Sequence, residues 1–136
     1  MKGTYLLLLE CLNDCEIEVG KLGKIRFKKG YYVYIGSSMN NLEKRILRHL
    51  KKDKKIKWHI DYLTTNDSFI IRKIFIKESN KKEEEKISKI FEKYFIFIKN
   101  FGNSDCKDNS HLFLINNFKV LYNIIKKLNF KNYNIV

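Results

Sequence analysis

Residues 31–50 read YYVYIGSSMNNLEKRILRHL, an aromatic strand that runs through a short turn into a charged amphipathic segment. Side chains alternate between the two faces of a pleated strand, so Tyr32, Tyr34 and Gly36 share one face. Gly36 and the polar pair Ser37-Ser38 end the strand. The sequence therefore predicts a strand that presents two tyrosines on one face just before the chain turns.

A helix is predicted to follow this strand, with Asn40 or Asn41 as its N-cap and its end near Lys52. The spacing of its apolar residues follows helical periodicity, and we expect the core side to consist of Leu42, Ile46 and Leu50. Adjoining faces of the same helix then carry Arg45, Arg48, His49 and Lys52. The tyrosine-bearing strand thus leads directly into a basic helix.

The remaining pattern predicts strands that cluster early in the chain and then alternate with helices. We expect strands over 3–10, 31–35, 69–76 and 111–115, a hairpin over 15–27, and helices over 58–63, from Ser79 or Asn80 to about Ile98, and over 118–128. This order indicates an α+β fold, a small and mainly antiparallel sheet flanked by helices. The length of 136 residues fits a single domain over 1–136.

Charge points to a polyanionic partner. The formal net charge is +13, and residues 41–60 hold eight basic and two acidic residues. Such a patch attracts phosphates in a salt-dependent way. We therefore expect a nucleic-acid contact formed by Arg48, His49, Lys51, Lys52, Lys54, Lys55 and Lys57. The alternative is that the lysines only keep a small protein in solution.

Neither a membrane segment nor a disulfide framework is indicated. The apolar run at 5–9 is too short for a signal-peptide core, so we expect a cytoplasmic protein that does not bind a membrane. Three cysteines at irregular spacing do not suggest disulfide bonds. A zinc site from Cys11, Cys15, Cys106 and His111 would match no familiar spacing.

Several motifs together resemble the GIY-YIG nuclease superfamily. They are Gly3-Thr4-Tyr5 on the first strand, Tyr34-Ile35-Gly36 on a later one, and the arginine-bearing helix that contains Arg45. More narrowly, the chain is similar to small domains of unknown function that are sometimes fused to an endonuclease III-type DNA glycosylase. That subgroup's segments stand here as WHIDYL at 58–63, and as Gly102, Ser104, Asp105, Cys106, Ser110, His111, Leu112 and Phe113. The chain departs from the superfamily in its longer interval between the two tyrosines and in Thr4, where isoleucine is usual.

The resemblance implies a metal-dependent endonuclease. Tyr5 and Tyr34 would position or activate water, and Arg45 would bind the scissile phosphate. Glu84 would hold one Mg²⁺ or Mn²⁺, and His59 would assist as a base or phosphate ligand. We prefer Glu84 over Glu83 and Glu85, because apolar residues follow it at helical spacing. A tyrosine deprotonates water only if its pKa falls below about 10, which nearby cations could achieve.

Each of these residues also has a structural interpretation. The tyrosines could be core aromatics, Arg45 one more phosphate-steering cation, Glu84 a carboxylate favoured at a helix N-terminus, and His59 a core histidine. The sequence thus favours a nucleic-acid endonuclease, with DNA preferred over RNA as substrate. The alternatives are a catalytically inactive nucleic-acid-binding module of the same fold and, more distantly, a structural protein bound to RNA.

Overall fold

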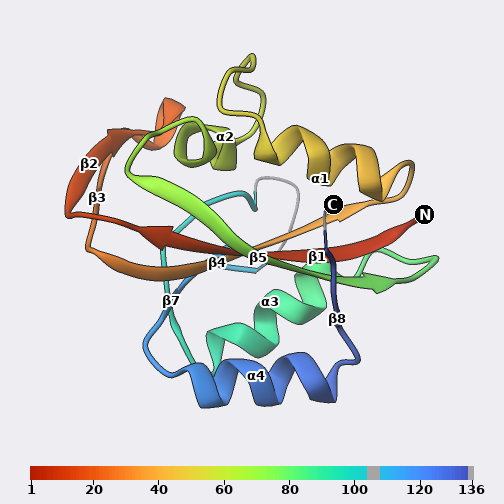
Figure 1. Cartoon of the computed structure of the whole chain (residues 1–136). Coiled ribbons are helices and arrows are strands. Elements are labelled where there is room, and N and C mark those ends of the chain that lie inside the picture. The colour runs from red at the N-terminus through yellow and green to blue at the C-terminus, as the bar shows by residue number, and fades with distance from the viewer. Residues whose placement is uncertain (104–107, 135–136) are drawn as a thin grey trace.

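The computed structural model describes residues 1–103 and 108–134, and its centre is an antiparallel sheet (Figure 1). Six strands pair in the order β6-β7-β4-β1-β5-β8. In chain order these strands are β1 (Gly3–Cys11), β4 (Gly30–Ser38), β5 (Phe69–Glu78), β6 (Ile96–Phe97), β7 (Leu112–Ile115) and β8 (Lys131–Asn132). The two longest hydrogen-bonded pairings join β1 to β4 and to β5. The expected α+β fold with a mainly antiparallel sheet is confirmed.

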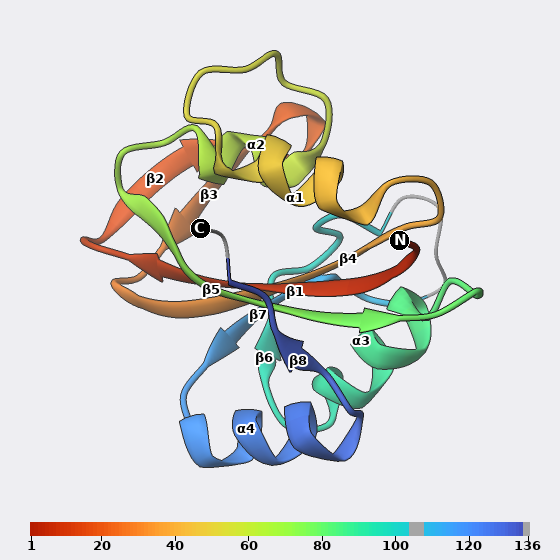
Figure 2. The same cartoon turned by 45° about the vertical axis from the view of Figure 1, so that its right-hand side comes forward.

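Helices cover both faces of this sheet. One face lies under α1 (Leu42–Leu50) and α2 (His59–Thr64), and the other packs against α3 (Glu84–Glu92) and α4 (Phe118–Lys127) (Figure 1). The predicted hairpin forms a separate two-stranded sheet, β2 (Cys15–Glu18) and β3 (Lys24–Phe27), with a 3₁₀ turn at Gly20–Leu22. Figure 2 shows this hairpin on the side of the sheet that carries α1 and α2.

Strand β1 divides the core into two clusters because its side chains alternate. Tyr5, Leu7 and Leu9 point into the cluster beneath α1 and α2, whereas Leu6 and Leu8 point toward α3 and α4. All five are buried. The continuous apolar run in the sequence therefore belongs to a central strand that is covered on both faces.

The structure changes two details of the predicted helices. The long helix expected from about residue 79 to 98 is only α3, and Ile96 and Phe97 pair with β7 instead. In α1 the inward positions are Leu42, Ile46 and His49, while Leu50 is 38% exposed. Leu42, Ile46 and His49 are spaced by four and then three residues, so the His49 imidazole lies on the buried side of the helix. The Asn41 cap is confirmed, since its side chain accepts a hydrogen bond from the backbone N–H of Lys44 at 3.0 Å.

None of the helices within residues 1–103 and 108–134 is both long enough and apolar enough to span a bilayer.

Candidate active site

The two tyrosines predicted from the sequence lie on paired strands and on one face of the sheet. Tyr5 of β1 stands opposite Gly36 of β4, and Tyr34 stands opposite Leu7 two positions further along. The ring centroids of Tyr5 and Tyr34 are 6.4 Å apart. Gly36 is needed here, because a Cβ atom at this position would overlap the Tyr5 ring. The glycine thus lets the Tyr5 ring pack directly against the neighbouring strand.

A pocket of about 610 Å³ opens beside these rings, and four of the predicted residues line it: Tyr5, Tyr34, Arg45 and Glu84. They come from four different elements, β1, β4, α1 and α3. Glu84 is the first residue of α3, and its Oε1 accepts a hydrogen bond from the Ser37 hydroxyl at 2.9 Å. Ser37, at the end of β4, therefore fixes the carboxylate relative to the tyrosines.

The three consecutive glutamates take different positions. Glu83 forms an ion pair with Lys77 at 3.2 Å and is not among the residues that line the pocket. Glu84 and Glu85 both line it. Only Glu84 is joined to β4 by the hydrogen bond from Ser37. The geometry thus separates Glu84 from Glu83, and Glu85 lines the same pocket as Glu84.

Arg45 is held in a defined orientation. Its Nη1 donates to the backbone carbonyl of Ser37 at 3.1 Å, and its guanidinium lies 4.3 Å from the centre of the Trp58 ring. A guanidinium over an indole face is stabilised by the cation–π interaction. Donors that stay in place can bind the non-bridging oxygens of a phosphate without first being reorganised.

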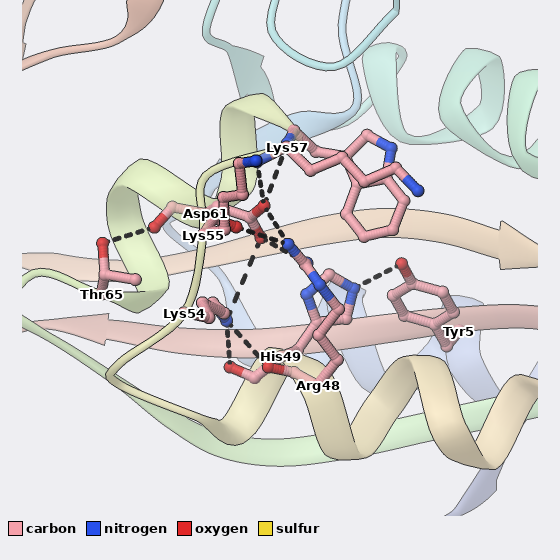
Figure 3. Close-up of polar contacts among 9 residues, drawn as sticks. Tyr5, Arg48, His49, Lys54, Lys55, Lys57, Asp61 and Thr65 are labelled. Carbon is pink, nitrogen blue, oxygen red and sulfur yellow. Dashed lines mark hydrogen bonds and ion pairs between the residues drawn. The ribbon is translucent and has the colours of Figure 1, made fainter.

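The sequence suggested that His49 contacts nucleic acid at the surface. The structure instead buries His49 behind Tyr5. Its side chain is 1% exposed, and its Nε2 lies 2.7 Å from the Tyr5 hydroxyl (Figure 3). Burial, reinforced by the charge of Lys54, lowers the pKa of His49 to about 3. The ring is therefore neutral at physiological pH, and Nε2 can accept the phenolic proton of Tyr5 when Nδ1 carries the ring proton.

Burial also determines the state of the tyrosines. It raises the pKa of Tyr5 well above its ordinary value, and Arg45 opposes this shift only in part. Burial likewise raises the pKa of Tyr34. Arg45 therefore does not bring the pKa of either tyrosine below its ordinary value, because desolvation outweighs its charge. Both side chains are neutral phenols at rest.

A buried histidine–carboxylate pair adjoins Glu84. Nε2 of His111 lies 2.8 Å from Oδ2 of Asp108, and its Nδ1 lies 3.8 Å from Oε2 of Glu84. His111 also lines the pocket, and burial raises the pKa of Asp108. The sequence marked His111 but gave it no role, and the structure places it between two carboxylates. Asp105 and Cys106 lie outside the described residues.

His59 is not among the residues that line the pocket. Its Nδ1 accepts a hydrogen bond from the backbone N–H of Gly102 at 2.9 Å, and its ring lies 5.6 Å from that of Phe101. Gly102 has a φ of +74° and lies against the Tyr34 ring. His59 therefore anchors the loop that packs on Tyr34, and the structure does not bring it together with Tyr5, Arg45 and Glu84.

Asp61 is a buried partner for two cations of the basic segment 41–60. Its carboxylate is fully buried and accepts two hydrogen bonds from the Arg48 guanidinium, both at 2.9 Å, while Lys54 lies 4.0 Å away (Figure 3). Burial alone would raise the pKa of Asp61, but Arg48 and the backbone N–H groups of Trp58 and Lys57 hold it below its ordinary value. Asp61 therefore holds the Arg48 guanidinium in place and lies close to the Lys54 ammonium.

The predicted nucleic-acid contacts thus fall into two groups. Lys54 donates to the carbonyls of Arg48 and His49 at the end of α1, and Lys52 donates to those of Asn66 and Phe69. Burial lowers the pKa of Lys54 to about 8. Lys51, Lys55 and Lys57 are exposed, as is Lys52, whereas Lys54 is partly buried. The net positive charge of this segment partly stabilises the fold and partly faces solvent.

Glu84 supplies the kind of oxygen donor that Mg²⁺ and Mn²⁺ accept. Within residues 1–103 and 108–134, no group of three or more His, Cys, Asp and Glu side chains is arranged to hold a metal. Mg²⁺ keeps most of its water and needs only one or two protein carboxylates. A single half-buried carboxylate at the wall of an open pocket satisfies that requirement.

Fold and site together define a small α+β domain with a polar pocket at the junction of β1, β4, α1 and α3. The chain belongs to the family described as domain of unknown function DUF123, whose model matches residues 4–132. No curated protein and no solved structure gives a significant match to it.

Proposed function

We propose that this protein is a divalent-metal-dependent endonuclease of the GIY-YIG type, which hydrolyses phosphodiester bonds in nucleic acid. One observation carries the proposal: Tyr5, Tyr34, Arg45 and Glu84 line a single pocket although they come from four elements. If the tyrosines were only core aromatics and Arg45 only a cation that attracts phosphates, their convergence with a hydrogen-bonded carboxylate in one pocket would not be expected. We take DNA as the substrate because the chain resembles domains that are fused to a DNA glycosylase.

In the proposed hydrolysis, Tyr5, His49 and Tyr34 act on the attacking water. A water attacks phosphorus, and the bond from phosphorus to the leaving sugar oxygen breaks. The Tyr5 oxygen accepts a hydrogen bond from this water, because Nε2 of His49, which lies 2.7 Å away, holds the phenolic proton of Tyr5. Tyr5 thus orients the water as a neutral phenol, in keeping with its raised pKa. Solvent takes the proton that the water loses, since the lowered pKa of His49 makes that ring a poor proton acceptor. Tyr34 orients the water, and solvent protonates the leaving oxygen.

Charge is balanced by the groups around the phosphate. Arg45, fixed by Ser37 and Trp58, binds the non-bridging oxygens as negative charge develops on them. Glu84 would hold one Mg²⁺ or Mn²⁺, which supplies Lewis acidity and stabilises the leaving group. Ser37 keeps the Glu84 carboxylate in place.

The test compares Glu84→Gln with Glu83→Gln on supercoiled plasmid and on branched DNA in Mg²⁺ or Mn²⁺. Loss of the metal ligand acts mainly on the transition state, so Glu84→Gln should reduce cleavage at least about a hundredfold. DNA affinity should stay equal or rise, because one negative charge is removed. Glu83→Gln removes the same charge from outside the pocket and should leave cleavage nearly unchanged.

Two outcomes would overturn the proposal. If the unsubstituted protein binds DNA but cleaves none of these substrates with either metal, the protein is an inactive binding module. If Glu84→Gln cleaves normally, Glu84 is not the metal ligand, and the proposed site is wrong at that residue.

A further inference from the structure

A second groove continues from the catalytic pocket along α1. It has a volume of about 610 Å³, and it shares Ser38, Asn40, Arg45 and Trp58 with the pocket. Because the two hollows have these walls in common, a chain whose phosphate lies at Arg45 can pass from one into the other. The groove therefore gives the substrate a defined direction away from the scissile bond.

The lining of the groove combines cations with apolar surface. The cations are Lys44, Arg45, Arg48, Lys51 and Lys57, and the apolar residues are Leu47 and Trp58. Leu47 is 49% exposed, in the middle of this basic surface. A duplex turns its phosphates and sugars outward and keeps its base faces stacked, so cations alone would suffice for it. Exposed apolar side chains among cations match an unpaired strand, which offers both phosphates and base faces.

Trp58 gives the groove its rigidity. The Arg48 guanidinium lies 4.5 Å and the Lys57 ammonium 4.8 Å from the centre of the Trp58 ring, in addition to Arg45 at 4.3 Å. Arg48 is held further by Asp61. Three cations are thus arranged around one indole, and they are oriented before a substrate arrives. Guanidinium planes and aromatic rings are the surfaces on which unpaired bases stack.

We propose that this groove binds a single-stranded segment of the substrate adjacent to the scissile phosphate, with an unpaired base against Leu47 and the guanidinium groups of Arg45 and Arg48 that cover Trp58. The inference rests on the proposed function, because the catalytic pocket defines where the strand begins. The substrate class is accordingly a nucleic acid with a junction between paired and unpaired strands.

Binding in EDTA tests the groove without cleavage. Trp58 is the only tryptophan in the chain, so its fluorescence reports on this site directly. The probes are a blunt duplex and the same duplex with a single-stranded tail of about six nucleotides, a length within the range that single-strand-binding grooves cover. The tailed duplex should bind about tenfold more tightly or better and should change the Trp58 emission, and the blunt duplex should do neither.

Leu47→Ser should reduce the preference for the tailed duplex at least about fivefold and leave binding of the blunt duplex unchanged. Ile96→Ser is the matched control, since Ile96 is 64% exposed on β6 and does not line the groove. Equal affinity for both probes, or a Leu47→Ser variant that keeps the full preference, would overturn the inference even if the protein cleaves DNA. Binding of the tail without any cleavage would instead overturn the proposed activity and support the groove.

Discussion

The two faces of the central sheet are packed by different kinds of side chain. The cluster packed by α3 and α4 consists of Leu, Ile, Val and Phe side chains. The face beneath α1 and α2 also buries tyrosines, together with His49 and Asp61. Buried polar groups cost stability unless a partner satisfies them, so they are expected where function requires them. The difference indicates that one face mainly supports the fold and the other carries most of the site, which Glu84 reaches from the first residue of α3.

The largest effect should come from the apolar face. Phe91→Ala removes a fully buried ring that packs on Phe95 and Phe113, and it should lower the free energy of unfolding by about 3–5 kcal/mol. Tyr5→Phe on the opposite face keeps the ring and loses one hydrogen bond, at about 1–2 kcal/mol. Urea unfolding measures both. Equal losses for the two variants would show that the faces do not differ in this way.

An intermediate effect should appear on the polar face as the pH falls. His49 has a pKa of about 3 in the folded protein and an ordinary value near 6.5 when unfolded. Its folded-state pKa is depressed, so the unfolded state binds the proton first, and stability is lost as pH falls below about 6.5. Between pH 7 and pH 5 the loss from this residue should be about 2 kcal/mol.

The variant His49→Asn isolates this contribution. It should be less stable than the unsubstituted protein at pH 7, and its stability should fall by about 2 kcal/mol less between pH 7 and pH 5. Other titrating groups remain in both proteins and cancel in the difference. Parallel curves of unfolding free energy against pH would show that His49 is not held neutral behind Tyr5.

The smallest effects on stability should distinguish cations that donate hydrogen bonds within the fold from cations that face solvent. Lys54→Gln removes hydrogen bonds at the end of α1 and should cost about 1 kcal/mol in urea unfolding. Lys51→Gln, at an exposed site, should change stability by less than about 0.5 kcal/mol. It should instead lower the salt dependence of DNA binding by roughly one unit of log–log slope. The opposite pattern, a lower slope for Lys54→Gln at unchanged stability, would contradict the assignment.

The local spacing of apolar residues was sufficient to predict most of the strands and helices. Alternation along residues 31–35 and the helical spacing of Leu42 and Ile46 identified the strand and helix that carry the site, because side-chain periodicity follows directly from backbone geometry. The same alternation placed Tyr32 and Tyr34 on one face, which the structure confirms, and pairing of β1 with β4 brings Tyr5 into the same cluster. The end of the helix at 79–98 was missed, because pairing of Ile96 and Phe97 with β7 overrides local helix propensity.

The positions of the polar residues depended on partners far away in the sequence. His49 turns inward because Tyr5, 44 residues earlier, offers a hydroxyl, and Glu84 meets Ser37 across 47 residues. Helical periodicity limits each residue to one side of its own helix but does not say which distant group that side will face. The sequence by itself therefore determined most of the elements, the shared face of Tyr32 and Tyr34, and the excess of positive charge. The packing of the helices on the sheet determined which histidine, glutamate and lysines belong to the site.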